Sequence, residues 1–427
     1  MTDAILKTTL TNGLSILLKE IHTAPLISSW IWYRVGSKDE TTGLTGISHW
    51  VEHMQFKGTP THPSDVMDKA ISREGGMWNA FTYLDWTTFL ETLPASKIEL
   101  ALSLEADRML NSIYDPDEVA SERTVIISER EGSENEPMFQ LNETVQAAAF
   151  SVHPYHHQVI GDKADLQTIS RDDLYNHYRS HYLPNNAVLA LAGDFDSLAM
   201  LARITELFES IPAGSPATRL NRPEPEPSGE HRLDVHGPGK TTFIEIAYRY
   251  PSATDPDLFP FMVLDSLLSG PSNPSVFGGG GISNKTSRLY RALVEKDLAV
   301  GVFGSGQVTL DPYLYTTNIT LSTDNNAEKA LSAFDKEITR VQENLITEAE
   351  IQRAIKQARA IFSYGTENIT HQAAWLGFSE MFADYQWFEH YLDKLAEVTP
   401  DDIQRIAQNW LVPNKRLIGT YIPDGEV

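Results

Sequence analysis

Two similar segments of the sequence lie 215 residues apart, and they constrain the fold more than any other feature. Ile31-Trp32-Tyr33-Arg34 and Ile246-Ala247-Tyr248-Arg249 each close an apolar stretch of the kind that forms a buried strand. Both halves then continue in the same alternation of helices and strands, each over about 200 residues. The sequence therefore predicts an internal duplication.

A proline-rich stretch, Arg222 to His231 (RPEPEPSGEH), lies between the two halves. Alternating prolines favour a stiff, extended conformation, so this stretch is the best candidate for a linker. Strands and helices interleave on both sides of it, which indicates an α+β fold. We expect an N-terminal domain over residues 1–221, a linker over 222–231 and a homologous C-terminal domain over 232–427.

The charge balance of the chain argues against a nucleic-acid partner. The chain has 58 Asp and Glu against 34 Lys and Arg, a formal net charge of −24. Phosphate backbones repel such a surface, so we expect no nucleic-acid partner.

The sequence also lacks the apolar run that crosses a bilayer, so we expect no membrane span. The first residues are typical of a strand, a turn at Asn12-Gly13 and a second strand rather than a signal peptide. We expect a cytoplasmic protein, with the periplasm as the alternative for a chain from which a signal peptide has been removed.

A glycine-rich stretch in the second half, GPSNPSVFGGGGISNKTS, superficially suggests a phosphate-binding loop. That motif requires glycine immediately before the lysine, and Asn284 stands before Lys285 here. A surface loop is the better interpretation.

The segment His49-Trp50-Val51-Glu52-His53 carries the strongest chemical signal. On a helix these two imidazoles and the carboxylate project from one face, within an arc of about 100°. Because the chain has no cysteine, a metal site here must use imidazole, carboxylate or water ligands. The alternative is an ordinary solvent-facing helix. Apolar neighbours such as Ile47, Val51 and Met54 predict instead a buried helix, on which three ionisable groups are costly unless they bind something.

The second copy carries no such motif. At the offset of 215 residues, His49, Glu52 and His53 fall opposite the three leucines Leu264, Leu267 and Leu268. Only the first half is therefore expected to bind a metal.

A catalytic zinc site needs a third protein ligand. Glu122 and Glu129 lie seven residues apart, which places them two turns along one face of a helix. From spacing alone, an ordinary surface pair of glutamates explains them better than a ligand does.

Four stretches together resemble a known family: GSKDETTGLTGISHWVEHMQFKGT, EGGMWNAFTYLDWTTF, SERTVIISERE and HPYHHQVIGD. They are similar to the M16 family of inverted-motif zinc peptidases, such as pitrilysin and the mitochondrial processing peptidase. The resemblance implies that His49, His53 and Glu129 hold Zn²⁺, that Glu52 is the general base and that Glu122 supports the ligands. It also implies two domains, each a mostly antiparallel sheet packed with helices, that form half of a clamshell.

The same resemblance assigns a substrate-binding strand. Its edge, at Asn79, Ala80 and Phe81, is expected to bind the peptide backbone as an added strand. The function implied is that of a zinc metalloendopeptidase acting on extended or unfolded peptides. The alternative is a non-catalytic binding or scaffold subunit. The histidine cluster in HPYHHQ, at residues 153, 156 and 157, is interpreted as a structured loop.

The sequence departs from the family in its second half. Active members carry an Arg and a Tyr there, in positions that correspond to Val294 and Val300 of this chain. Neither valine can donate a hydrogen bond to a substrate carbonyl. We therefore expect a heterodimer in which a related M16 subunit supplies the Arg/Tyr pair, with a homodimer as the alternative.

Overall fold

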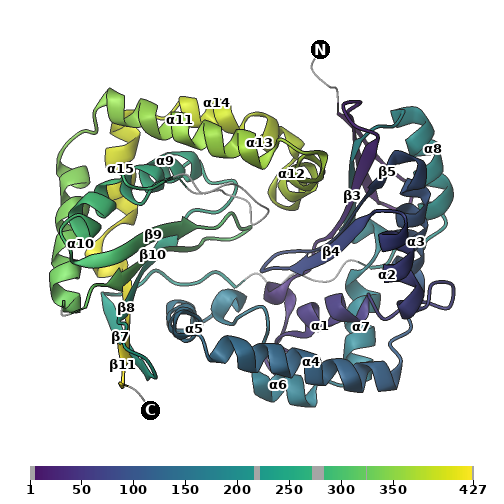
Figure 1. The fold of residues 1–427 in the computed structure, drawn as a ribbon, viewed down its shortest axis with the longest axis horizontal. Helices are drawn as coiled ribbons and strands as arrows, with labels where there is room; N and C mark the ends of the chain where they lie inside the picture. The colour runs from purple at the N-terminus through teal and green to yellow at the C-terminus, as the bar shows by residue number, and fades with distance from the viewer. Residues whose placement is uncertain (1–4, 216–221, 272–282, 324, 426–427) are drawn as a thin grey trace. The chain divides into compact units, whose positions relative to one another are not determined.

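The computed structural model describes residues 5–215, 222–271, 283–323 and 325–425, so most of the glycine-rich stretch lies outside the described residues. The chain forms two compact units that are interleaved along the sequence. Each unit contains one sheet covered by helices, which confirms the α+β fold class (Figure 1). The first unit consists of Met1–Glu131, His157–Asn221 and Thr366–Phe388, and the second of Gly132–His156, Arg222–Gly365 and Glu389–Val427.

The sheet of the first unit has the strand order β1-β2-β6-β3-β5-β4 in the described residues. All neighbours are antiparallel except β2 and β6, which are parallel. The strands are β1 (Leu6–Thr9), β2 (Ser15–Glu20), β3 (Leu26–Tyr33), β4 (Met77–Thr82), β5 (Thr87–Pro94) and β6 (Ala187–Gly193).

The sheet of the second unit repeats this plan with the order β7-β11-β8-β10-β9. It too contains one parallel pair, β7 and β11, and its other neighbours are antiparallel. The shared order and the shared parallel pair confirm the internal duplication. The strands are β7 (His231–Gly237), β8 (Phe243–Tyr250), β9 (Ala299–Gly306), β10 (Tyr313–Leu321) and β11 (Leu417–Pro423).

Helices cover the sheets in both units, and none that the structure describes is both long and apolar enough to cross a membrane. The first unit contains α1 (Ile47–Met54), α2 (Ser64–Arg73), α3 (Ile98–Asn111), most of α4 (Pro116–Glu134), α6 (Lys163–Thr168), α7 (Arg171–His181), α8 (Ser197–Phe208) and α12 (Ile369–Phe382). The second contains α5 (Pro137–Ala149), α9 (Leu258–Leu268), α10 (Ala327–Glu343), α11 (Glu348–Gly365), α14 (Tyr391–Ala396) and α15 (Pro400–Trp410), and α13 (Tyr385–Glu389) lies at the boundary.

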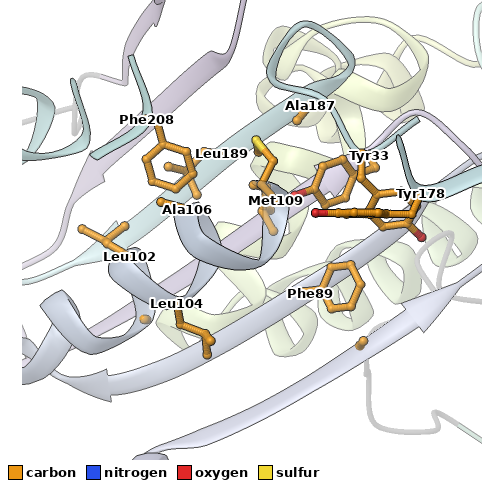
Figure 2. Close-up of a cluster of buried hydrophobic side chains, with 14 of the residues drawn as sticks. Tyr33, Phe89, Leu102, Leu104, Ala106, Met109, Tyr178, Ala187, Leu189 and Phe208 are labelled. Carbon is orange, nitrogen blue, oxygen red and sulfur yellow. The ribbon is translucent and has the colours of Figure 1, made fainter. Parts of the chain in front are cut away.

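The core of the first unit lies between its sheet and helices such as α3, α7 and α8. Strand β6 is buried at every residue, in keeping with its uninterrupted apolar sequence AVLALAG. Figure 2 shows side chains of this core, including Tyr33, Phe89 and Tyr178 around Met109 of α3. Side chains of α1 belong to the same cluster, so the helix that carries His49, Glu52 and His53 is part of the core.

Each sheet is completed by a helix from the opposite half of the sequence. Helix α12 packs against β3 and β6 of the first unit, whereas α5 packs against β8 and β11 of the second. The division expected from sequence, at residues 222–231, does not anticipate this exchange. The repeated arginines hold both helices: Arg34 donates to the carbonyl oxygen of Glu380 in α12 (3.2 Å), and Arg249 donates to that of Ala149 in α5 (2.7 Å).

Residues 222–230 form neither helix nor strand, and they are tied to the second unit by Glu224. The Glu224 carboxylate accepts hydrogen bonds from the backbone N–H groups of Ser151, Val152 and His153, each 2.8 Å long. Burial opposes its ionisation, but these hydrogen bonds outweigh it and hold the pKa of Glu224 at about 2. The predicted linker is therefore an anchored segment of the second unit.

The contact between α12 and β3 leads to a stability prediction. A Cβ atom at Gly377 would lie 2.0 Å from Nε1 of the buried Trp32, which is far closer than side-chain packing allows. We expect Gly377→Ala to lower the free energy of unfolding by about 1–3 kcal/mol, because overpacking outweighs the gain in helix propensity. Chemical denaturation measures the change.

Gly132 is the matched control, since it also lies in a helix but a Cβ atom added there would meet nothing within 4 Å beyond the backbone of its own helix. Gly132→Ala is expected to raise the free energy of unfolding by about 0.5–1 kcal/mol. Equal effects at the two glycines would contradict the packing argument.

Candidate metal centre

Helix α1 begins at a glycine that no other residue replaces without strain. Gly46 has φ of 85°, and a Cβ there would lie 2.5 Å from the carbonyl oxygen of Ile160. The buried Glu40 carboxylate accepts hydrogen bonds from the N–H groups of Gly46 and Ser48, both 2.8 Å long. Its Oε2 also lies 2.9 Å from Nε2 of His157. The start of α1 is therefore fixed by a charged, buried anchor.

The two faces of α1 differ sharply in character. Ile47, Trp50, Val51 and Met54 are at most 2% exposed and pack into the core, which confirms the predicted burial of this helix. The opposite face presents His49, Glu52 and His53. Because the apolar face cannot rotate out of the core, the polar face has a fixed direction.

The structure brings three predicted metal ligands together. His49 and His53 from α1 and Glu129 from α4 each offer one ligand atom, and these atoms all lie within 4.8 Å of one another. Nε2 of His53 is 3.8 Å from a carboxylate oxygen of Glu129, and the two imidazole rings are 4.6 Å apart between centroids. Within the described residues, this is the group whose geometry suits a metal ion.

His53 is oriented by Glu122, the other glutamate singled out on α4. Nδ1 of His53 lies 2.8 Å from Oε1 of Glu122, which leaves Nε2 directed toward Glu129. The second oxygen of Glu122 lies 2.5 Å from Nζ of Lys57. Burial opposes ionisation of Glu122, but its bonds to His53 and Lys57 outweigh burial and lower its pKa. Burial likewise opposes the charge on His53, whereas Glu122 and the nearby carboxylates raise the pKa of its imidazole above the ordinary value.

His49 is the more deeply buried of the two imidazoles. Burial, with a further contribution from the charge on His53, lowers the pKa of His49 to about 3, so the ring is neutral at physiological pH. Its Nδ1 atom is buried and has no hydrogen-bond partner among the described residues. A neutral imidazole, a second imidazole with an oriented Nε2 and a carboxylate form the N, N, O donor set of catalytic zinc sites, so the residues present fit Zn²⁺.

Glu52 lies on the same face of α1 and is 8% exposed. Thr82 of β4 donates a hydrogen bond of 2.7 Å to its Oε2 atom. Burial raises the pKa of Glu52 to about 7, although the hydrogen bond from Thr82 and the charge on His53 act in the opposite direction. A cation bound beside it would favour the ionised form again. A carboxylate of this kind is suited to accept a proton near neutral pH.

The strand expected to bind substrate lies at an edge of its sheet in the described residues, beside α1. Asn79 and Phe81 of β4 are exposed, whereas Ala80 between them is buried. One side of β4 pairs with β5, and its other side faces no strand of the described residues, although the N–H group of Ala80 donates to Oδ1 of Asn79 (2.9 Å).

Two histidines of the HPYHHQ segment contact different partners. His157 pairs with Glu40, whereas Nε2 of His153 lies 3.4 Å from Asp311. Sequence reasoning missed the part that Glu40, His157, Lys57 and Thr82 take in positioning α1 and its side chains. Glu40 binds the nearby Gly46 and Ser48, and Lys57 follows the motif closely. The contacts of these four residues with more distant partners join residues 30 to 117 positions apart, and no local spacing signals them.

The two valines that replace the expected Arg and Tyr lie in the second unit. Val294 ends a short helical turn, and Val300 is 66% exposed on β9, at an edge of the described second sheet. Neither position offers a polar side chain, as the sequence indicates.

Two family models match successive parts of the chain. A family model described as "Insulinase (Peptidase family M16)" matches residues 15–163, and one described as "Peptidase M16 inactive domain" matches residues 168–358. An uncharacterized zinc protease of Mycobacterium leprae is 28% identical over 98% of this chain and 92% of its own length. Zinc protease PqqE of Helicobacter pylori is 27% identical over 94% of this chain and 89% of its own length. The mitochondrial-processing peptidase subunit beta of Lentinula edodes is 26% identical over 94% and 86%.

Solved structures show the same fold. The crystal structure of a protease from Helicobacter pylori superposes with a TM-score of 0.91 at 24% identity, covering 99% of this chain and 100% of that one. A peptidase M16 inactive domain from Pseudomonas fluorescens superposes with a TM-score of 0.87 at 18% identity, covering 99% and 98%.

The anchor of α1 can be tested directly. Glu40→Ala leaves two buried N–H groups and His157 without their carboxylate, so we expect the free energy of unfolding to fall by about 3–5 kcal/mol. Glu206→Ala on α8, whose side chain is 67% exposed, is the control and should change it by less than about 0.5 kcal/mol. Urea denaturation of both variants, compared with the unmodified chain, measures the difference. A change at Glu40 as small as that at Glu206 would show that α1 does not depend on this anchor.

Proposed function

The chain belongs to the M16 peptidase family, and we propose that it is a zinc metalloendopeptidase that hydrolyses extended or unfolded peptides. The observation that carries the proposal is the cluster of His49, His53 and Glu129 beside the buried carboxylate of Glu52. A scaffold subunit needs neither the three convergent ligands nor a carboxylate held in a buried position. The names of the zinc proteases to which the chain is similar support the same class of reaction.

His49, His53 and Glu129 would hold the zinc ion, with Glu122 fixing the ring of His53. When bound there, Zn²⁺ supplies a positive charge that lowers the pKa of water and polarises a carbonyl group. Mn²⁺ and Co²⁺ accept similar ligands, but Zn²⁺ is preferred for two imidazoles and a carboxylate.

Glu52 would act as the general base. It takes a proton from the attacking water and later returns it to the nitrogen of the leaving amine, so that it is regenerated in each cycle. Its burial keeps bulk water from competing for the carboxylate, and its place on α1, three residues after His49 and next to His53, keeps it beside the metal ligands.

The substrate would lie along β4 at Asn79, Ala80 and Phe81. Pairing with an edge strand requires free backbone N–H and C=O groups, which folded proteins have already used in their own structure. This requirement favours extended peptides. Main-chain hydrogen bonds give affinity in such a mode, and side chains on either face set the preference.

We further propose that a related M16 subunit completes the site with an Arg/Tyr pair. Val294 and Val300 cannot donate hydrogen bonds to the substrate, and this is the reason for inferring a partner. The mitochondrial-processing peptidase subunit beta to which the chain is similar is, by its name, one subunit of a larger enzyme. A homodimer is the alternative assembly.

The role of the base is tested by Glu52→Gln. The amide keeps the shape of the side chain but does not accept the proton of water, so we expect the rate of cleavage of an unstructured peptide to fall by about 100-fold or more. Bound zinc, measured by atomic emission, should remain stoichiometric. Glu328→Gln on α10, whose side chain is 72% exposed, is the control and should retain the original rate.

Two results would contradict the proposal. An unchanged rate in Glu52→Gln would exclude this carboxylate as the base. An absence of bound zinc in the unmodified chain, together with no cleavage, would favour the non-catalytic subunit instead.

The partner is tested by measuring cleavage by this chain alone and after mixing with a related subunit that carries the Arg/Tyr pair. An added donor to the developing oxyanion contributes about 2.7–4 kcal/mol, so we expect the mixture to be roughly 100-fold faster or more. Equal rates would show that the chain needs no partner.

A further inference from the structure

We propose that Thr82 is the positioning residue of the catalytic site, and that it ties the general base to the strand along which the substrate binds. The proposal rests on the peptidase function above and deepens it. It begins from a contact that joins two elements, the hydrogen bond of 2.7 Å from Oγ1 of Thr82 on β4 to Oε2 of Glu52 on α1.

The direction of β4 brings Thr82 to Glu52. Side chains alternate along a strand, so Trp78, Ala80 and Thr82 share one face of β4 and Asn79 and Phe81 share the other. The first face is directed toward α1 and its flanking residues, since Trp78 packs edge-on against Phe56 with ring centroids 4.7 Å apart. Thr82 ends the strand on this face, next to the base.

Thr82 gives Glu52 the only hydrogen bond that the described residues provide to its carboxylate. The hydroxyl group has one proton to donate. The neighbouring Thr87 lies 3.4 Å away and directs its own proton to the carbonyl oxygen of Val35 (2.9 Å). Thr82 is thus free to donate to Glu52 alone, and it engages one of the two carboxylate oxygens.

This contact restrains a flexible side chain. Glutamate has three rotatable bonds, and fixing Oε2 leaves Oε1 as the oxygen that takes the proton. An oriented base reacts more readily than a mobile one, because the cost of ordering it is met before the reaction begins. A hydrogen bond to an ionised group is strong enough to hold such an orientation.

Strand β4 also positions the substrate. A peptide paired with Asn79, Ala80 and Phe81 takes its register from β4, and Thr82 is the next residue of that strand. The base and the substrate are therefore positioned by the same four residues.

The test compares Thr82→Val with Thr82→Ser. Valine has nearly the shape of threonine and keeps the preference for a strand, but it has no hydroxyl group. We expect Thr82→Val to lower kcat by about 10- to 100-fold, while KM and bound zinc stay as in the unmodified chain. Thr82→Ser restores the donor and should recover most of that loss.

Thr88→Val is the matched control. It removes a hydroxyl hydrogen bond of 2.9 Å, to the carbonyl oxygen of Ile31, from the residue of β5 that pairs with Phe81. The same chemical change on the adjacent strand should leave kcat unaltered, because this hydroxyl does not contact Glu52.

A second measurement needs no activity. In zinc-free protein, Thr82→Val should lower the thermal unfolding midpoint of the otherwise unmodified chain but not that of Glu52→Ala, where the hydrogen bond is already absent. Equal shifts in both backgrounds would overturn the proposal, as would an unchanged kcat or a rise in KM alone. A failure of the peptidase function itself is distinguishable, since it appears as a rate that does not depend on Glu52.

Discussion

The hydrogen bonds that Glu40 makes to the first residues of α1 are the constraint on which the site depends. A helix of two turns has little stability by itself, so its position is set by its surroundings. The apolar face of α1 fixes its rotation in the core, and Glu40 fixes its start. Together they determine where His49, Glu52 and His53 point. Every later contact, from Glu122 to His53 and from Thr82 to Glu52, requires that placement to be correct within a fraction of an ångström.

The duplication explains why the site occurs once. Apart from β1, the described strands of both sheets have the same order, and a helix follows the corresponding strand in each unit, α1 after β3 and α9 after β8. In α1 the motif places charged groups on the helix, whereas Leu264, Leu267 and Leu268 of α9 are buried apolar side chains. One copy has kept a polar face at some cost in stability, and the other has become a purely structural helix. The family model described as an inactive domain covers residues 168–358, which include α9.

The local features of this chain could be predicted from its sequence, and the features that depend on distant contacts could not. The helix around His49 and the buried strand at Ala187–Gly193 follow from periodicity and composition, which act over a few residues. Apart from the family resemblance, nothing in the sequence marked Glu129 as a metal ligand, because an exposed glutamate on a helix is common. The packing of α5 on the second sheet and of α12 on the first could not be predicted for a different reason. Helix α12 is buried at every residue from Ala373 to Phe382, and α5 buries Leu141, Val145 and Gln146. Neither pattern indicates which sheet covers the helix, and only the assembled tertiary structure selects one of them.

Helix α12 also determines when the first unit can be completed during synthesis of the chain. Its partners β3 and β6 are finished by Gly193, but residues 369–382 emerge from the ribosome roughly 10–35 s later at ordinary rates of translation. Until then the indole rings of Trp32 and Trp86, which contact the ring of Phe378 in the finished unit, lack that partner. The first unit is thus incomplete for nearly half of the chain's synthesis, and these indole rings lack their α12 partner during that time.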